Sequence, residues 1–211
     1  GVPEATCMEA GLDMDPDQYD VIGAGPGIGT KLGAVEILTI ILKNYSGSLV
    51  LDADALNLIA ASTELAELVR QSAAKIIMTP HIGEARRLLK SSARLSDSEE
   101  RIKAVKELAE KYACIAVLKS EETLVNSHRE PEIVYKNTCG NPGMATGGSG
   151  DVLTGVITAL CGQGYSHIHR ACLGVFIHAT AGDLAAESLG EIGMMSSDIC
   201  ANLPTAFKKF Y

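Results

Sequence analysis

The stretch that decides the fold of this chain reads Asn137-Thr-Cys-Gly-Asn-Pro-Gly-Met-Ala-Thr-Gly-Gly-Ser-Gly-Asp-Val-Leu-Thr-Gly155. Five glycines fall within residues 140–150, and one acid, Asp151, follows them directly. After Asp151, apolar residues recur every three to four positions, which predicts a helix with one buried face. These apolar residues are Val152, Leu153, Val156, Ile157 and Leu160. The sequence therefore predicts a glycine-rich turn that leads into the N-terminus of a helix.

Such a turn is suited to hold a phosphate. The first N–H groups of a helix have no carbonyl partner within it, and the helix dipole adds partial positive charge there. Glycines also remove the side chains that would keep a phosphate away from the backbone. Because Asp151 repels anions, we expect it to take a proton from a hydroxyl beside the phosphate. The alternative interpretation is that Asp151 only caps the helix.

Composition sets the class of protein. The 211 residues are 46% hydrophobic and 4% aromatic, which predicts one domain with an aliphatic core, as in α/β proteins. There are 26 acids and 18 bases, with a net charge of −8 and no basic stripe, which argues against nucleic acid and anionic membranes as partners. Six scattered cysteines favour buried thiols in a reducing compartment over a disulfide framework. Because no apolar run could span a bilayer and no signal pattern opens the sequence, a cytoplasmic location is expected.

The order of predicted elements indicates a three-layer α/β/α fold around a mostly parallel sheet. After an irregular opening (1–17), buried strands are predicted at 19–23, 48–51, 75–78 and 114–118, with helical segments at 30–42, 62–72, 84–89 and 97–112 between them. A short antiparallel pair follows at 124–126 and 133–135, around a polar turn at 127–131. The glycine-rich stretch, its helix, and two more helices at 170–187 and 194–209 complete the chain.

Polar residues follow the predicted strands where open α/β sheets bind ligands, at the strands' carboxyl ends. Asp52 and Asp54 follow the second strand, His81 the third and Lys119 the fourth. Either aspartate could hold a magnesium shell or a substrate hydroxyl, or cap the next helix, which is the favoured interpretation for Asp54. His81 is either a ligand group or a structural residue. Lys119 is a natural partner for a phosphate.

The first strand runs into a second glycine turn, Gly23-Ala-Gly-Pro-Gly-Ile-Gly29. Its spacing fits neither a dinucleotide-binding fingerprint nor a Walker loop. The turn therefore serves either close approach of the backbone to a ligand or a tight strand–helix connection. His178 lies on the apolar face of the 170–187 helix and is expected to be a core histidine.

Four motifs occur together and in order: Gly25-Pro-Gly-Ile-Gly29, Leu51-Asp-Ala-Asp-Ala-Leu-Asn57, Thr79-Pro-His-Ile-Gly-Glu84 and the stretch from Gly140 to Gly155. In these four motifs and their order, the chain resembles the ADP-dependent (S)-NAD(P)H-hydrate dehydratases, repair enzymes of the ribokinase-like superfamily. Gln163-Gly164, Ala181-Gly-Asp183 and Ser197-Asp198 are also similar to that family. The resemblance covers nearly the whole chain.

The resemblance implies a ribokinase-like fold and the dehydration of (S)-NAD(P)H hydrate back to NAD(P)H at the expense of ADP or ATP, with Mg²⁺ bridging the phosphates. It implies Asp151 as the catalytic residue, and a substrate site formed by Gly25, Gly27, His81 and Asp151. It implies a nucleotide site formed by Lys119, Ser120, Glu121, Glu122, Thr123, Gly147, Gly148, Ser149 and Gly150. No residue is assigned as a metal ligand. A homo-oligomer such as a tetramer is expected, with the helix in the 170s as an interface.

Two features depart from the family pattern. Family members carry a further βαβ-type segment ahead of the position of residue 1, so residues 1–211 are expected to form a single domain that lacks it. The family's Lys-Gly-x-x-Thr motif appears here as Lys119-Ser-Glu-Glu-Thr123, which predicts altered nucleotide binding. Two rival hypotheses follow: a kinase for a vitamin precursor of the hydroxyethylthiazole or hydroxymethylpyrimidine type, and a nucleotide-binding module without catalysis.

Overall fold

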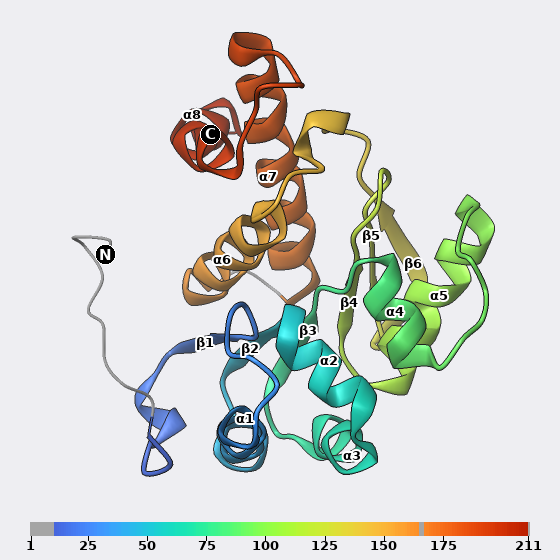
Figure 1. Cartoon of the computed structure of the whole chain (residues 1–211), viewed down its shortest axis with the longest axis vertical. Coiled ribbons are helices and arrows are strands. Elements are labelled where there is room, and N and C mark those ends of the chain that lie inside the picture. The colour runs from blue at the N-terminus through green and yellow to red at the C-terminus, as the bar shows by residue number, and fades with distance from the viewer. Residues whose placement is uncertain (1–10, 165–166, 211) are drawn as a thin grey trace.

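A six-stranded sheet in the order β1-β2-β3-β4-β5-β6 forms the centre of the protein (Figure 1). The structure is a computed structural model that describes residues 11–164 and 167–210. The first four strands are parallel and the last two are antiparallel, which confirms the predicted mostly parallel sheet. The strands are β1 (Val21–Ala24), β2 (Ser48–Leu51), β3 (Lys75–Met78), β4 (Ile115–Leu118), β5 (Leu124–Ser127) and β6 (Glu130–Lys136).

Five helices connect the parallel strands and cover one face of the sheet. Each connection leads from one strand to its immediate neighbour, and crossovers of the same hand place their helices on the same side. These helices are α1 (Leu32–Asn44), α2 (Ala53–Ala61), α3 (Thr63–Gln71), α4 (Ile82–Leu89) and α5 (Ser98–Lys111). The other face is left for helices that come later in the chain.

Helices α6 (Ser149–Gly162) and α7 (His167–Leu189) cover that second face. Side chains alternate along each strand, so Leu49 and Leu51 belong to the core under α1–α5 while Val50 packs with Ile157 of α6. Helix α8 (Ser196–Phe210) lies beside α7 and away from the sheet (Figure 1). The inner parallel strands β2, β3 and β4 are thus largely buried on both faces, as expected for parallel strands, whereas β1 and β6 at the edges are more exposed.

Most predicted elements are confirmed to within two residues, but the β5–β6 turn is shorter than predicted. The expected polar turn ran to residue 131, whereas β6 begins at Glu130. A register shift at Asn126 and Ser127 tightens the connection, and the Asn126 amide donates to the carbonyls of Pro131 and Ile133 at 3.2 and 2.7 Å. The Asn126 side chain therefore ties β5 to the first residues of β6.

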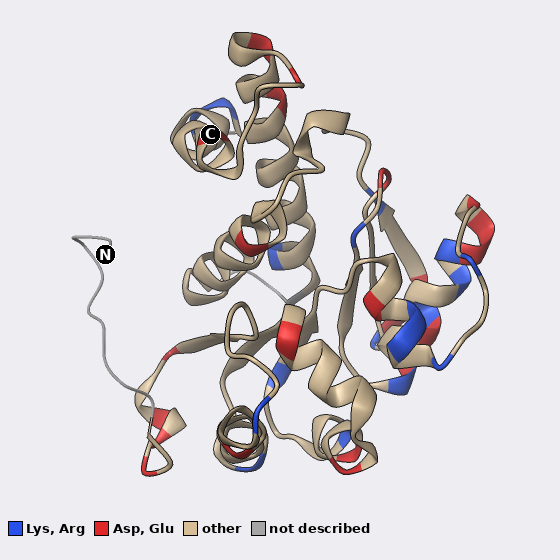
Figure 2. Cartoon of the chain, viewed as in Figure 1, with Lys and Arg blue, Asp and Glu red and all other residues tan. Residues whose placement is uncertain are grey.

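The described cysteines are all free thiols. Cys114 and Cys161 are buried and Cys139 and Cys172 partly so, but Cys200 is exposed, which corrects the expectation of buried thiols at that position. Cys7 and the first part of the irregular opening lie outside the described residues. Within 11–164 and 167–210, no helix has both the length and the apolar character to cross a membrane. Lysines, arginines and acids are interspersed over α4 and α5 (Figure 2).

Candidate active site

The glycine-rich stretch does lead into a helix N-terminus. Gly148 is the N-cap of α6 and adopts a left-handed conformation with φ of 87°, which favours glycine. A side chain added at Gly148 would also come within 2.9 Å of the Ser196 hydroxyl. The N-cap makes no side-chain capping bond, and Asp151 lies exposed in the first turn. The interpretation of Asp151 as the helix cap is therefore wrong, and its carboxylate faces solvent beside the first amides of α6.

Lys119 reaches this helix N-terminus from the end of β4. Its ammonium lies 2.7 Å from Oδ1 of Asp52, and it would be 3.2 Å from a Cβ added at Gly150. The other carboxylate oxygen of Asp52 accepts a hydrogen bond from the Thr154 hydroxyl at 2.6 Å. Asp52 is 1% exposed. A cation, a buried carboxylate and the opening of α6 thus meet at the carboxyl edge of the sheet.

The turn from Gly25 to Gly29 lies next to Asp52. A side chain at Gly25, whose φ is 133°, would clash with the carbonyl oxygen of Asp52, so this position needs glycine. The carboxylate of Asp54 accepts a hydrogen bond from the Gly29 amide at 2.9 Å. The favoured interpretation of Asp54 as a cap is therefore wrong, because Asp52 holds the N-cap position and Asp54 lies within the first turn of α2. Gly27 faces open space, with no atom within 4 Å of an added Cβ.

His81 is the N-cap of α4. Its Nδ1 accepts hydrogen bonds from the amides of Gly83 and Glu84 at 2.9 and 3.3 Å, and the Glu84 carboxylate accepts from the His81 amide at 2.8 Å. Because Nδ1 accepts, the ring proton of the neutral imidazole is on Nε2, which lies 3.3 Å from Glu84. The side chain is 53% exposed and its backbone bridges to Lys119. His81 thus has a clear structural role, and its predicted role in substrate binding stays a prediction.

The segment from Lys119 to Thr123 turns its acids away from the lysine. Glu121 and Glu122 both pair with Arg101 of α5, at 2.6 and 3.8 Å, and Glu122 also pairs with Lys136 of β6 at 2.6 Å. The bond from Lys136 holds the pKa of Glu122 below its ordinary value. The Ser120 hydroxyl donates to the carbonyl of Glu122 at 2.9 Å and that of Thr123 to the carbonyl of Ser120 at 3.3 Å. The two acids are therefore paired with neighbouring bases and not with the Lys119 ammonium.

Three site residues were missed in reasoning from the sequence. Thr154 lies one turn after Gly150 on α6, which is the only local hint of its bond to Asp52. Asp183 of α7 accepts hydrogen bonds from the Gly140 amide and the Asn141 side chain at 2.9 and 3.0 Å, so it holds the start of the glycine-rich stretch. His178 lies 3.4 Å from the buried Ser149 hydroxyl. Asp183 belongs to a motif that the sequence singles out, but its partners lie 43 and 42 positions away.

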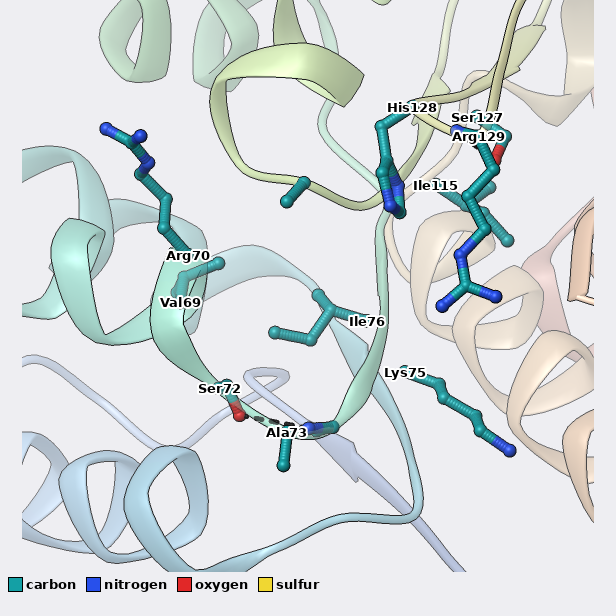
Figure 3. A pocket seen from close by; sticks show the side chains of 12 residues that line it. Val69, Arg70, Ser72, Ala73, Lys75, Ile76, Ile115, Ser127, His128 and Arg129 are labelled. Atoms are coloured by element: carbon teal, nitrogen blue, oxygen red, sulfur yellow. Dashed lines mark hydrogen bonds between the residues drawn. The ribbon is translucent and has the colours of Figure 1, made fainter.

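A cavity at the opposite edge of the sheet contains none of these residues (Figure 3). It lies at the amino ends of β3 and β4, beside the β5–β6 turn, with Lys75, His128 and Arg129 among its lining residues. The candidate site is instead the carboxyl edge, where Gly25, Asp52, Lys119 and Gly150 meet.

Comparison with known proteins shows which family this chain is related to. The chain is 40% identical over 205 residues to the bifunctional NAD(P)H-hydrate repair enzyme of Coxiella burnetii, covering 95% of this chain and 40% of that protein. It is 39% identical over 178 residues to the ADP-dependent (S)-NAD(P)H-hydrate dehydratase of Neisseria meningitidis, covering 83% of this chain and 58% of that protein. The chain thus spans about two fifths to three fifths of the length of these relatives.

A solved structure shows the same fold. The ADP/ATP-dependent NAD(P)H-hydrate dehydratase of Bacillus subtilis, co-crystallised with ATP and Mg²⁺ and soaked with CoA, superposes with a TM-score of 0.79 at 25% identity. The match covers 92% of this chain and 67% of that one. The family model described as NAD(P)H-hydrate dehydratase matches residues 3–205. The chain therefore belongs to the NAD(P)H-hydrate dehydratase family.

Proposed function

We propose that this site dehydrates (S)-NAD(P)H hydrate to NAD(P)H at the expense of ADP or ATP. The observation that carries the proposal is the meeting of Lys119 with the first turn of α6, where Gly150 and Asp151 lie. An ammonium and the first amides of α6, which no side chain caps, offer a phosphoryl group positive charge, and Asp151 offers a base beside it. The activities for which the Neisseria and Bacillus relatives are named support dehydration over release of a phosphorylated vitamin precursor.

The chemistry accounts for the use of a nucleotide. In the hydrate, a hydroxyl is bonded to the nicotinamide carbon next to the ring nitrogen, and hydroxide is a poor leaving group at neutral pH. Asp151 takes the hydroxyl proton as the oxygen attacks the terminal phosphorus of the nucleotide, and the bond to the departing nucleotide oxygen breaks. The ring nitrogen's lone pair then expels inorganic phosphate, and loss of a proton from the neighbouring carbon restores the dihydronicotinamide.

The residues divide between the two ligands. The amides of Gly147–Gly150 hold the charge that develops on the phosphoryl group, and the segment from Lys119 to Thr123 faces the rest of the nucleotide. Gly25 and Gly27 allow close approach of the hydrate, with His81 at the neighbouring strand end. This division rests on the resemblance together with the convergence of the described residues at one sheet edge.

Magnesium fits this site as an ion that would be bound together with the nucleotide. In the part of the chain that the structure describes, no group of three or more His, Cys, Asp or Glu residues could hold a metal ion. Mg²⁺ is commonly bound by one or two carboxylates plus the phosphates of a substrate. The phosphates of the nucleotide and water would supply its oxygen ligands, which leaves the exposed carboxylate of Asp151 to act as the base. When bound, the ion neutralises phosphate charge.

Replacement of the proposed base tests the function. Asp151→Asn and Asp151→Ala should lower turnover about 10²- to 10⁴-fold, which is the contribution of general-base catalysis. ADP affinity measured by calorimetry should stay within a few-fold of the parent. Turnover is followed by the return of NADH absorbance from its hydrate, dependent on ADP and accompanied by inorganic phosphate.

The matched control is Glu64→Gln, which removes an exposed acid from the first turn of α3 on the other face of the sheet. It should leave the rate unchanged. Turnover in Asp151→Ala equal to the parent would contradict the role of Asp151. A phosphorylated product without NADH would point to a kinase instead.

We further propose that residues 1–211 act as a single domain, that the protein works in the cytoplasm, and that it forms a homo-oligomer through α7. Sedimentation velocity tests the last of these. Parallel assays with ADP and ATP, and with the hydrates of NADH and NADPH, measure the preferences for nucleotide and substrate.

A further inference from the structure

Asp52 is a buried carboxylate with both oxygens engaged. Oδ1 lies 2.7 Å from the Lys119 ammonium and Oδ2 accepts from Thr154 at 2.6 Å. The lysine side chain is only 19% exposed, so the pair lies largely out of water. A buried charge is stable only when it is paired and hydrogen-bonded. Here the Asp52 carboxylate and the Lys119 ammonium pair with each other.

The position of Asp52 is built into the fold. Its amide donates to the carbonyl of Ala24 on β1 at 3.1 Å, and its carbonyl leaves no room for a side chain at Gly25. The next residue, Ala53, has a left-handed conformation with φ of 48°, which is unusual for alanine and turns the chain directly after the carboxylate. Strain of this kind persists only where the surrounding structure holds it in place.

The pair also resolves an electrostatic conflict. The Lys119 ammonium and the N-terminus of α6 both bring positive charge to the same point, because a Cβ at Gly150 would be 3.2 Å from Nζ. These charges repel each other until a phosphate arrives. Asp52 offsets the repulsion, and through Thr154 it links the lysine to the helix that carries Asp151.

We propose that Asp52 is a positioning residue that holds the Lys119 ammonium over the first turn of α6, where the phosphoryl charge develops, and that it is not a magnesium ligand. This inference rests on the proposed function. Asp52 competes with the phosphate for Lys119 in the ground state. Asp52 holds the ammonium in the position from which it stabilises the charge of the transferring group. Displacement of a positioned group by about 1 Å can cost 10²-fold in rate.

The first test is Asp52→Asn. The variant removes the competing charge but keeps the side-chain shape, so the ADP affinity should equal or exceed that of the parent. Turnover should fall about 10- to 100-fold because the Lys119 ammonium is no longer held over the first turn of α6. The Mg²⁺ concentration for half-maximal rate should stay within about 2-fold of the parent, since a direct metal ligand would change metal affinity. A merely structural defect would weaken binding and rate together.

The second test avoids a charged substitution. Thr154→Val removes the hydroxyl that holds Oδ2 and should slow turnover about 10-fold, whereas Thr154→Ser keeps the donor and should stay within about 3-fold. The matched control is Thr158→Val, one turn further along α6, whose hydroxyl bonds only to the carbonyl of Thr154 in the described structure, at 2.8 Å. It should leave the rate near that of the parent.

Two results would overturn the proposal. One is a half-maximal Mg²⁺ concentration at least 10-fold higher in Asp52→Asn, with the rate restored by excess metal, which would make Asp52 a metal ligand. The other is turnover equal to the parent in both Asp52→Asn and Thr154→Val. If the parent itself restores no NADH, the proposed function fails separately. The ADP affinity then decides the role of Asp52: unchanged or tighter binding in Asp52→Asn supports it, and a 10-fold loss refutes it.

Discussion

His178 lies behind the glycine-rich stretch as a buried histidine, 7% exposed and 3.4 Å from the Ser149 hydroxyl. The expectation of a core histidine is thus confirmed, and its contact with the turn was not foreseen. Burial, the largest cause, acts together with the charge of Lys119 and against an opposing hydrogen bond with the Ser149 backbone, and the pKa of His178 is lowered from 6.5 to about 4. The imidazole is therefore neutral at pH 7, which adds no further positive charge behind Lys119.

This pKa makes a prediction about acid stability. The unfolded chain binds the His178 proton below about pH 6.5 and the folded chain only near pH 4, so stability is complete above pH 6.5 and falls as the pH drops towards 4. The loss from His178 should be about 3 kcal/mol between pH 7 and pH 4. Urea unfolding at a series of pH values measures it. His178→Gln should give a curve flatter by that amount, and parallel curves for variant and parent would contradict the assignment.

At the scale of elements, α6 and α7 pack closely because α7 carries a glycine at their contact. A Cβ added at Gly174 would lie 2.6 Å from Cγ1 of Ile157, a residue of α6 that is fully buried against the sheet. The close approach fixes how α6 lies on the sheet and hence where its first turn meets Lys119. The shape of one helix–helix contact is thus linked to the geometry of the site.

Gly174→Ala tests this contact. In a free helix the change would stabilise by about 1 kcal/mol, but the clash with Ile157 should make it destabilising by about 1–3 kcal/mol. Ile157→Ala alone should cost about 2–5 kcal/mol through the cavity that it leaves. The double variant should be more stable than the sum of the two losses, since the new methyl group occupies part of the cavity. Additive losses in denaturant unfolding would show that the two residues do not share one space.

At the scale of the whole molecule, the carboxyl edge collects groups from both layers of helices and from four strands. Gly25 follows β1, Asp52 follows β2, His81 follows β3 and Lys119 follows β4, and α6 brings Gly150 from the opposite face. The cavity in Figure 3 lies at the other edge and is separate from this arrangement. A nucleotide bound at the carboxyl edge should therefore stabilise the fold as a unit.

Thermal unfolding with ADP and Mg²⁺ measures this coupling. Free nucleotide at 100 times its Kd should stabilise the chain by about 2.7 kcal/mol, which is roughly 5–10 °C in Tm for a domain of this size. Lys119→Ala should lose most of that shift. Lys75→Ala, which removes an exposed lysine beside the opposite cavity, should keep it. An equal shift in both variants would place the nucleotide elsewhere.

The sequence by itself determined the parts of this protein that depend on local pattern. Strands β2 and β3 have the bounds that their apolar runs predict, and the glycine-rich stretch opens α6 as its composition requires. The order of strands and helices indicated the layered α/β/α fold, and the motifs indicated the family. Hydrophobic period, glycine conformation and turn chemistry act over a few residues, so they can be read from the chain directly.

Only the tertiary structure decided which polar groups meet. The bonds of Asp52 to Lys119 and to Thr154 join residues 67 and 102 positions apart. Asp54 bonds to Gly29 and not to its own helix, and Glu121 pairs with Arg101 of α5. Such pairings depend on which strands become neighbours and on how α6 packs against the sheet. No local period encodes them, and that is why the sequence indicated the participants of the site but not their partners.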